Sequence, residues 1–178
     1  MARGEFPFLV LPGFAALIAV GASLVHAASV EPKPAYAAHA TQLEASTVAA
    51  TAKTVFARAD LDNDGALSRE EYVTLAIVTA ELGRLNGFVP VDYAGGVRTA
   101  PLPRNAVWSK GERARIETAA ERDYALFAGD DQRLSSDEFV ASQLESLTAA
   151  DLDRNGVLTG AELPRFAAIE ARLPARQS

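Results

Sequence analysis

Two twelve-residue stretches place oxygen-bearing side chains at alternate positions, which is the arrangement that a hard metal ion requires. One stretch covers residues 60–71 and the other residues 151–162, and both fit the pattern D-x-[DN]-x-[DN]-G-x5-E. Calcium takes six to eight oxygen ligands at roughly 2.3–2.6 Å, so carboxylates must converge on it from alternate positions of a loop. The two stretches therefore predict two loops that bind Ca²⁺.

The pattern assigns six ligand positions to each loop. In the first loop they are Asp60, Asp62, Asp64, the backbone carbonyl of Ala66, Ser68 and Glu71. In the second loop they are Asp151, Asp153, Asn155, the backbone carbonyl of Val157, Thr159 and Glu162. A capped turn without metal is the alternative interpretation, because each loop also ends in a capping-box spacing. A cap explains the final Glu, but it does not explain acidic or amide residues at three alternate positions.

The stretches that flank the loops have the periodicity of amphipathic helices. Helices are predicted over residues 41–59, 69–82, 109–128, 136–150 and 160–173, with apolar residues on one face of each. No stretch alternates long enough to predict a strand of more than a few residues, so the expected fold class is all-α. Residues 86–109, which are rich in Gly and Pro, are predicted to be a linker.

With Phe56 before the first loop and Tyr72 after it, the chain resembles the EF-hand family. The resemblance implies helix–loop–helix units, and these normally associate in pairs through the residue at loop position 8. A third unit looks degenerate, since only Asp131 and Glu138 fall on ligand positions and Asp130 falls between them; an ordinary acidic turn is the alternative interpretation. Leu134 of this unit precedes Leu158 of the second loop by 24 residues. We therefore expect a degenerate and an intact hand to form a C-terminal pair, with the first hand separate. The partner of the first hand is left open between residues 88–91, the C-terminal pair and a second molecule.

The N-terminus has the pattern of a signal peptide. No charged residue occurs from Phe6 to Val25, and Ala27–Ala28 is the expected cleavage site. An uncleaved membrane anchor is the alternative. The expected organisation is a signal peptide (1–27), a flexible lead-in (28–40), a first EF-hand (41–85), the linker (86–109) and a hand pair (110–173). The protein is thus expected to be exported, to a bacterial periplasm.

Composition excludes several function classes. The 17 Lys and Arg residues against 23 Asp and Glu give a net charge of −6, and no basic stretch favours nucleic-acid binding. No membrane contact is expected beyond the signal segment. The absence of Cys removes thiol catalysis and Cys-ligated metals. No catalytic motif is present, so the protein is not expected to be an enzyme.

The expected function is calcium binding, as a sensor, a buffer or a calcium-stabilised interaction module whose protein partner is unknown. Two alternatives remain open. One is lanthanide binding, because the signal peptide for export and the close spacing of the hands are similar to those of lanmodulin. That family's Pro at loop position 2 and Asp at position 9 are replaced by Leu61 and Leu152, and by Ser68 and Thr159. The other is a structural or interaction module in which residues 83–109 carry the activity and metal binding is incidental.

Overall fold

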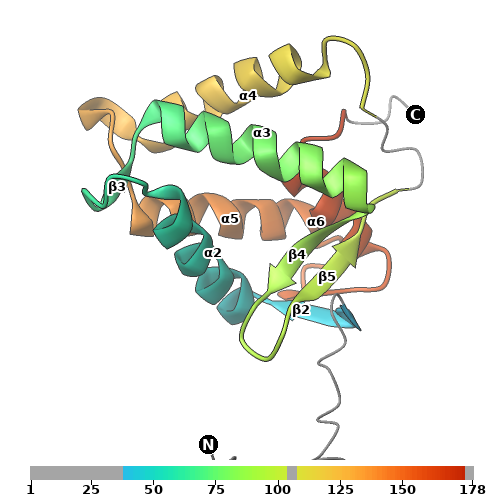
Figure 1. The fold of residues 1–178 in the computed structure, drawn as a ribbon. Helices are drawn as coiled ribbons and strands as arrows, with labels where there is room; N and C mark the ends of the chain where they lie inside the picture. The colour runs from blue at the N-terminus through green and yellow to red at the C-terminus, as the bar shows by residue number, and fades with distance from the viewer. Residues whose placement is uncertain (1–37, 104–107, 175–178) are drawn as a thin grey trace, which may run out of the picture. The chain divides into compact units, whose positions relative to one another are not determined.

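The structure, a computed structural model, describes residues 38–103 and 108–174 of the 178-residue chain (Figure 1). The helices are α2 (Ala45–Ala59), α3 (Arg69–Asn86), α4 (Glu112–Phe127), α5 (Ser136–Ala150) and α6 (Glu162–Glu170), with a 3-10 turn η1 (Gly129–Asp131). The strands are β1 (Ala38–His39), β2 (Gln42–Glu44), β3 (Ala66–Leu67), β4 (Phe88–Asp92), β5 (Arg98–Pro101), β6 (Leu134–Ser135) and β7 (Val157–Thr159). The expected signal peptide and residues 28–37 of the lead-in lie outside the described residues.

The expectation of an all-α fold is wrong. Alongside the five helices, the described part of the chain contains seven strands in three sheets, so the fold is mixed α/β. Most of the strands are two or three residues long, which is too short for alternation to reveal them in the sequence. Within the described ranges, no helix combines the length and the apolar character needed to cross a membrane.

The stretch predicted to be a linker contains a β-hairpin. Strands β4 and β5 pair antiparallel, and β1 joins β5 in a parallel arrangement. Val89 and Val91 point inward and are each 2% exposed, while Pro90 between them is exposed. Because β4 is an edge strand, the missing N–H of Pro90 costs little there. The hairpin lies against α2, α3 and α6 and contributes to the core.

The pairing of the loop strands also differs from the expectation. Strand β3 of the first loop pairs with β6, so that Leu67 faces Leu134. Strand β7 of the second loop pairs with β2, so that Leu158 faces Leu43. The degenerate hand is therefore the partner of the first hand and not of the second. The second loop pairs instead with the strand that precedes α2.

This arrangement repeats within the chain. We call β2, α2, the first loop, β3 and α3 the first unit, and β6, α5, the second loop, β7 and α6 the second unit. Leu43 precedes Leu67 by 24 residues, and Leu134 precedes Leu158 by the same number. Helix α2 packs against α5, and each unit's first strand pairs with the loop strand of the other (Figure 1). Each metal loop is thus supported by the opposite unit.

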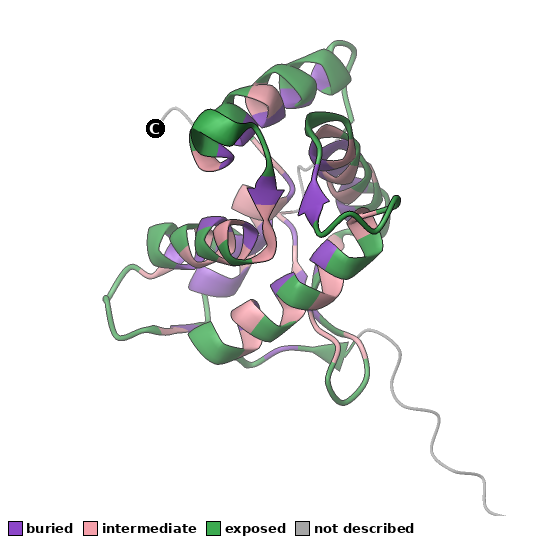
Figure 2. Ribbon diagram, turned by 90° about the vertical axis from the view of Figure 1, so that its left-hand side faces the viewer, coloured by how far each residue is buried: buried purple, intermediate pink, exposed green. Residues whose placement is uncertain are grey.

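Two hydrophobic clusters are centred on these two strand pairs. The cluster around β3 and β6 contains Leu67 and Leu134, and the rings of Phe56 and Phe139 contact each other in it, tilted by 51° at a centroid distance of 6.1 Å. The cluster around β2 and β7 contains Leu43 and Leu158 together with the hairpin. Figure 2 shows the buried residues on the faces of the helices that meet each other and the exposed residues on the outer faces. The cores therefore hold the loop strands in place.

A buried ion pair joins α3, α4 and the end of α6. The Arg84 guanidinium donates to Glu112 Oε1 at 2.6 Å and to the carbonyls of Ala80 and Ala171 at 3.0 and 2.6 Å. The Arg84 side chain is only 2% exposed, and Arg115 also pairs with Glu112. Burial lowers the pKa of Arg84, while Glu112 opposes this effect. The pair fixes the position of α4 relative to α3.

The pairing of β2 with β7 makes a testable prediction. Replacing Leu43, which is 2% exposed, with Val removes one buried methylene and should lower the free energy of unfolding by about 1 kcal/mol. The same change at Leu126, which is 72% exposed on α4, should have almost no effect. Thermal unfolding followed by circular dichroism measures both. If the two variants unfolded at the same temperature, residue 43 would not belong to the core.

Candidate metal centres

The first loop has the backbone geometry that lets side chains converge. Asn63 and Gly65 both adopt left-handed conformations, with φ of 58° and 83°. Gly tolerates such a φ without strain, and Asn is among the side chains that adopt it most readily. The N–H groups of Asp64 and Gly65 then donate to the two oxygens of Asp60, at 3.1 Å each. The loop is thereby folded around the Asp60 carboxylate.

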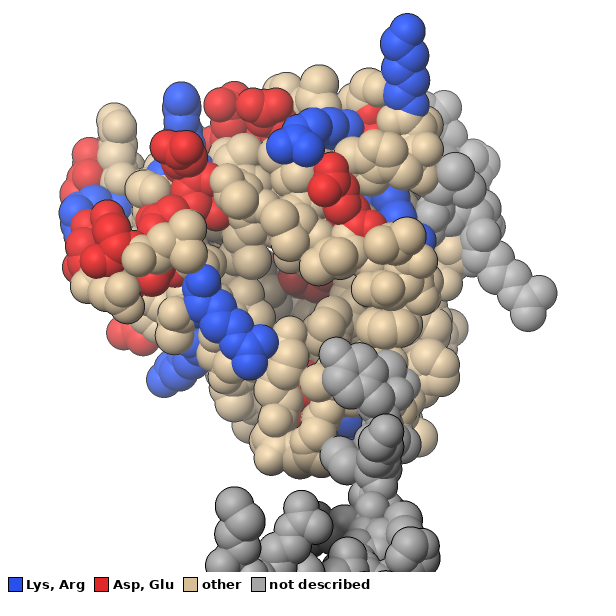
Figure 3. Space-filling view, in the orientation of Figure 1, with Lys and Arg blue, Asp and Glu red and all other residues tan. Residues whose placement is uncertain are grey.

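The structure brings three of the predicted ligands of this loop together. Oxygens of Asp60, Asp62 and Glu71 all lie within 4.8 Å of one another. Two oxygens bound to one Ca²⁺ are separated by at most about 5 Å, since each lies roughly 2.5 Å from the ion. The cluster therefore fits a calcium ion. Acidic side chains gather at the end of the molecule that carries this loop, next to β3 in Figure 1 (Figure 3).

Glu71 is held at the position where it can close the site. Its Oε2 accepts from the N–H and the hydroxyl of Ser68, at 2.9 and 2.8 Å. Its Oε1 accepts from the N–H of Leu61 at 2.8 Å. The Ser68 N–H contributes most to lowering the pKa of Glu71, and burial only partly offsets it. The carboxylate is thus ionised, as a metal ligand must be, and Ser68 and Glu71 also form the predicted capping box.

Asp64, the predicted ligand at position 5, is oriented differently. Its Oδ2 accepts from the guanidinium of Arg133 at 2.8 Å, and its Oδ1 accepts from the N–H of Ala66 at 3.0 Å. The Ala66 N–H lowers the pKa of Asp64 most, followed by Arg133. Arg133 belongs to the degenerate hand, which β3 and β6 place beside the first loop. The degenerate hand therefore contributes a positive charge to the site.

This contact predicts that Arg133 weakens calcium binding by the first loop. Arg133→Gln removes a cation that competes for Asp64, and we expect the affinity to rise only about two- to fivefold, because an exposed ion pair contributes little free energy. The gain should shrink at high salt, where exposed charges are screened. Calorimetric titration measures it. Arg122→Gln, which changes an exposed arginine of α4, is the control; an equal gain there would indicate net charge alone.

The second loop repeats the geometry of the first. Oxygens of Asp151, Asp153 and Glu162 lie within 4.8 Å of one another. Gly156 and Arg154 adopt left-handed conformations, with φ of 81° and 61°, as Gly65 and Asn63 do. The Gly156 N–H donates to Asp151 Oδ2 at 2.9 Å and lowers the pKa of Asp151 most. Two loops distant in the sequence thus fold alike.

Glu162 closes the second loop from the start of α6. Its Oε1 accepts from the N–H of Leu152 at 2.8 Å and its Oε2 from the N–H of Thr159 at 2.9 Å. These bonds, with the one from Thr159 largest, lower the pKa of Glu162. Asn155 at position 5 accepts from the N–H of Val157 at 2.7 Å and donates to Asp153 at 2.9 Å. Ala66 and Val157, whose carbonyls are the predicted ligands at position 7, begin strands β3 and β7.

The degenerate hand does not assemble a comparable cluster. Asp130 and Asp131 fall in the 3-10 turn η1, and Glu138 caps α5 by accepting from Ser135. Among the described residues these three do not form a group with the spacing of a metal site. Tyr124 of α4 instead donates to the carbonyls of Leu67 and Gln132, at 3.2 and 2.5 Å. This hand therefore acts as a support for the first loop.

Sequence reasoning missed two contributors to these sites. The strand around Leu43 was hidden because it precedes any recognisable loop, although its 24-residue distance from Leu67 matches that between Leu134 and Leu158. Arg133 gave no signal, because its proximity to Asp64 depends on the pairing of β3 with β6. Only the repeated spacing, and not a motif, could have indicated the strand around Leu43.

The comparisons with known proteins agree with this geometry over part of the chain. A family described as EF hand matches residues 52–76, which cover the end of α2, the first loop and the beginning of α3. No curated protein and no solved structure matches the chain. The match and the two carboxylate clusters support an EF-hand calcium-binding family and indicate calcium binding.

Proposed function

We propose that this is an exported, non-enzymatic calcium-binding protein with two ion sites. The observation that carries the proposal is the pair of carboxylate clusters in two loops of the same backbone geometry. Asp60, Asp62 and Glu71 would hold one ion, and Asp151, Asp153 and Glu162 the other. The ions would neutralise carboxylates that otherwise repel one another. Export to the periplasm is proposed from the sequence of residues 1–27 alone.

The ions would stabilise the fold as a whole. Each loop continues into a strand that pairs with the opposite unit, through Leu67 with Leu134 and through Leu43 with Leu158. An ion that orders one loop therefore also favours docking of the two units. A protein without disulfides gains stability from such ions, as free energy of binding becomes free energy of folding.

Thermal unfolding with and without calcium tests this proposal. Each site that binds only the folded chain adds about 2.7 kcal/mol when the free ion is at 100 times its dissociation constant. We expect a dissociation constant of roughly 10⁻⁶ to 10⁻³ M for this protein, which lies between the sensor and extracellular classes of EF-hands. We expect a rise of several degrees in the unfolding midpoint on adding calcium, and a reversal by chelator. An unchanged midpoint at millimolar calcium would contradict the proposal.

The same assay with La³⁺ in competition decides between calcium and lanthanide capture. Position 9 carries Ser68 and Thr159, which add no charge to the carboxylates that each loop already has. We therefore propose that the loops bind La³⁺, but that their affinity for La³⁺ does not exceed their affinity for Ca²⁺ by orders of magnitude. A preference above a thousandfold would favour the lanthanide alternative.

A second candidate function is calcium-dependent binding of a protein. A groove of about 630 Å³ runs along α3, and its lining includes both Leu82, which is 50% exposed, and the predicted ligand Glu71. If calcium opened the groove, fluorescence of the hydrophobic dye anilinonaphthalene sulfonate should rise on adding calcium and fall in Leu82→Lys. Leu126→Lys, at an exposed site on α4, is the matched control. If the dye fluorescence did not change with calcium, the second candidate function would be contradicted, and stabilisation of the fold by calcium would remain as the proposed role.

A further inference from the structure

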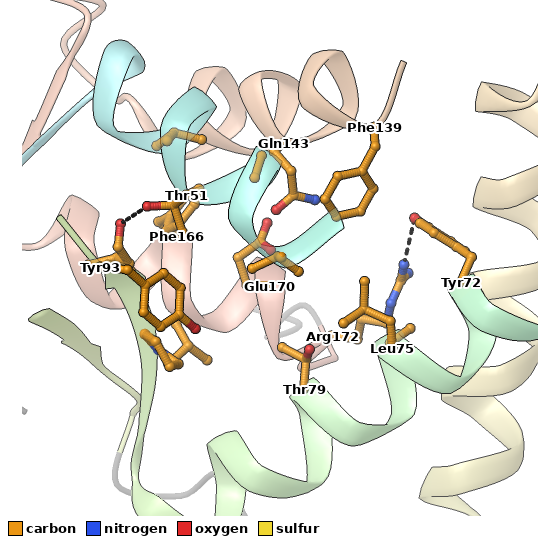
Figure 4. Close-up of a pocket in the computed structure, with 17 residues that line it drawn as sticks. Thr51, Tyr72, Leu75, Thr79, Tyr93, Phe139, Gln143, Phe166, Glu170 and Arg172 are labelled. Atoms are coloured by element: carbon orange, nitrogen blue, oxygen red, sulfur yellow. Dashed lines mark hydrogen bonds between the residues drawn. The ribbon is translucent and has the colours of Figure 1, made fainter. Parts of the chain in front are cut away.

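A cavity lies between the two units, at the meeting point of α2, α3, β4, α5 and α6 (Figure 4). Its volume is about 120 Å³, and none of the proposed metal ligands lines it. The corresponding region of the surface is hollowed in Figure 3. A cavity of roughly 150 Å³ can hold a benzene molecule, so this one has room for a ligand of about five or six heavy atoms.

Two charged residues line the cavity, and only one of them is neutralised. The Arg172 guanidinium pairs with Asp123, donates to the Tyr72 hydroxyl at 3.1 Å and lies over the Tyr72 ring at 5.9 Å. Glu170, by contrast, has no salt bridge to any residue in the described part of the chain. It is half-buried and accepts a hydrogen bond from Ser146; burial raises its pKa, while Ser146 and the charge of Arg172 partly oppose this effect. A carboxyl without a salt bridge therefore faces the cavity, and the cation that acts on it, Arg172, is already paired with Asp123.

The Gln143 amide is the second polar group available to a ligand. Figure 4 shows Glu170 directed from α6 toward Gln143 on α5, with the two groups on the same side of the space. Within the described ranges Gln143 makes no hydrogen bond, whereas the Thr51 hydroxyl is already bonded to the carbonyl of Val91 at 3.0 Å. Gln143 is half-buried, so its amide, which has no partner in the described part of the chain, is accessible to a ligand in the cavity.

The rest of the wall is apolar and aromatic. Phe139 and Phe166 line the cavity together with Tyr93 and with aliphatic side chains of α2 and β4. Aromatic faces attract cations through their quadrupole, and the attraction is larger where water is excluded. An anion would meet the Glu170 carboxyl, and a purely apolar ligand would leave the Gln143 amide without a partner. The lining therefore favours a small molecule with one positive and one apolar end.

The repeat of the two units shows that the carboxyl of Glu170 and the amide of Gln143 occur only in the second unit. Ninety-one residues separate Leu43 from Leu134, and the same offset relates Ala52 to Gln143 and Thr79 to Glu170. The first unit thus contributes small side chains where the second contributes a carboxyl and an amide, and all four line the cavity. Small residues on one side leave the space, and polar residues on the other side face into it.

We propose that this cavity binds a small organic cation, namely a primary ammonium group on a short apolar chain. The ammonium group donates to the Glu170 carboxylate and to the Gln143 carbonyl oxygen. The apolar chain lies against Phe166 and Phe139. The nearby cation favours the ionised form of Glu170, so that its proton is released to solvent on binding. This site is separate from the calcium loops and does not depend on them.

Titration of the protein with three ligands of one size tests the proposal. The probes are n-butylammonium, n-butanol and n-butyrate, followed by amide chemical shifts at constant millimolar calcium. We expect n-butylammonium to bind at least ten times more tightly than n-butanol, and n-butyrate to bind more weakly than either. Equal affinities for the ammonium and the alcohol would show an apolar cavity only. No binding of any probe at 10 mM would show a cavity that holds water; either result overturns the proposal.

Glu170→Gln supplies the matched variant. It keeps the shape of the side chain but cannot carry the charge, so n-butylammonium should lose about tenfold in affinity while n-butanol is unchanged. Glu145→Gln, at an exposed position of α5, is the control and should leave all affinities unaltered. Undiminished ammonium binding by Glu170→Gln would place the cation elsewhere. The comparison of the three ligands on the unaltered protein remains decisive even if this variant does not fold.

Discussion

Glu71→Gln is expected to weaken one of two calcium-binding events by about 100-fold and to leave the other unchanged. The amide keeps an oxygen that can accept from Leu61 or Ser68, so the loop retains its shape. It loses the charge and the two-oxygen contact that position 12 gives to the ion. A loss of about 2.7 kcal/mol corresponds to that factor and is within the range for removing a charged partner. Isothermal titration of the variant and the unaltered protein measures it.

Glu70→Gln is the control, because Glu70 is adjacent, exposed and outside the carboxylate cluster. Glu162→Gln should weaken the other binding event in the same way. We expect Glu71→Gln to act on the tighter of the two, since the first loop has four carboxylates and the second has Asn155 at position 5 and Arg154 beside it. If Glu70→Gln and Glu71→Gln weakened binding equally, the effect would be one of net charge and not of coordination.

Glu112→Gln is expected to lower the free energy of unfolding by about 3–5 kcal/mol, the usual cost of leaving one charge of a buried pair uncompensated. The Arg84 guanidinium would then keep only carbonyl acceptors while remaining inside the protein. The unfolding midpoint should fall by about 10 °C, because 1 kcal/mol corresponds to roughly 2–4 °C in a domain of 150–250 residues and slightly more in this one. Thermal and denaturant unfolding both measure the change.

Two further variants separate the ion pair from other effects of residue 112. Glu117→Gln changes an exposed carboxylate of the same helix and should cost less than about 0.5 kcal/mol. The double variant Arg84→Met with Glu112→Leu removes both charges and should recover most of the stability, as apolar replacements of buried pairs often do. A double variant as unstable as Glu112→Gln would show that the pair is not the cause.

The metal loops could be predicted from the sequence because their geometry is local. Asp60, Asp62 and Glu71 lie within twelve residues, and Gly65 fixes the turn between them, so spacing alone determines which oxygens meet. The same argument holds for Asp151, Asp153 and Glu162. The helices on either side were predictable for a similar reason, since their apolar residues recur at helical spacing. The orientation of Asp64 was not, because it depends on Arg133, which is distant in the sequence.

The pairing of the units depends on long-range contacts and was mispredicted for that reason. Distance along the chain favoured Leu134 as the partner of Leu158, but α5, which links these two residues, packs along α2 and brings Leu134 to Leu67. The hairpin was hidden by Pro90 and by the glycines of its turn, which resemble a linker until burial of Val89 and Val91 is considered. The ion pair of Arg84 with Glu112 and the Glu170 cavity likewise arise only when several helices meet.

Counting the bound ions tests the central claim most directly. The purified protein, freed of metal with a chelator and dialysed against millimolar calcium, should retain two Ca²⁺ ions per chain by elemental analysis. Glu71→Gln and Glu162→Gln should each retain one when calcium is set between the dissociation constants of the intact and the altered loop. A chain that retained none would contradict the assignment of both loops.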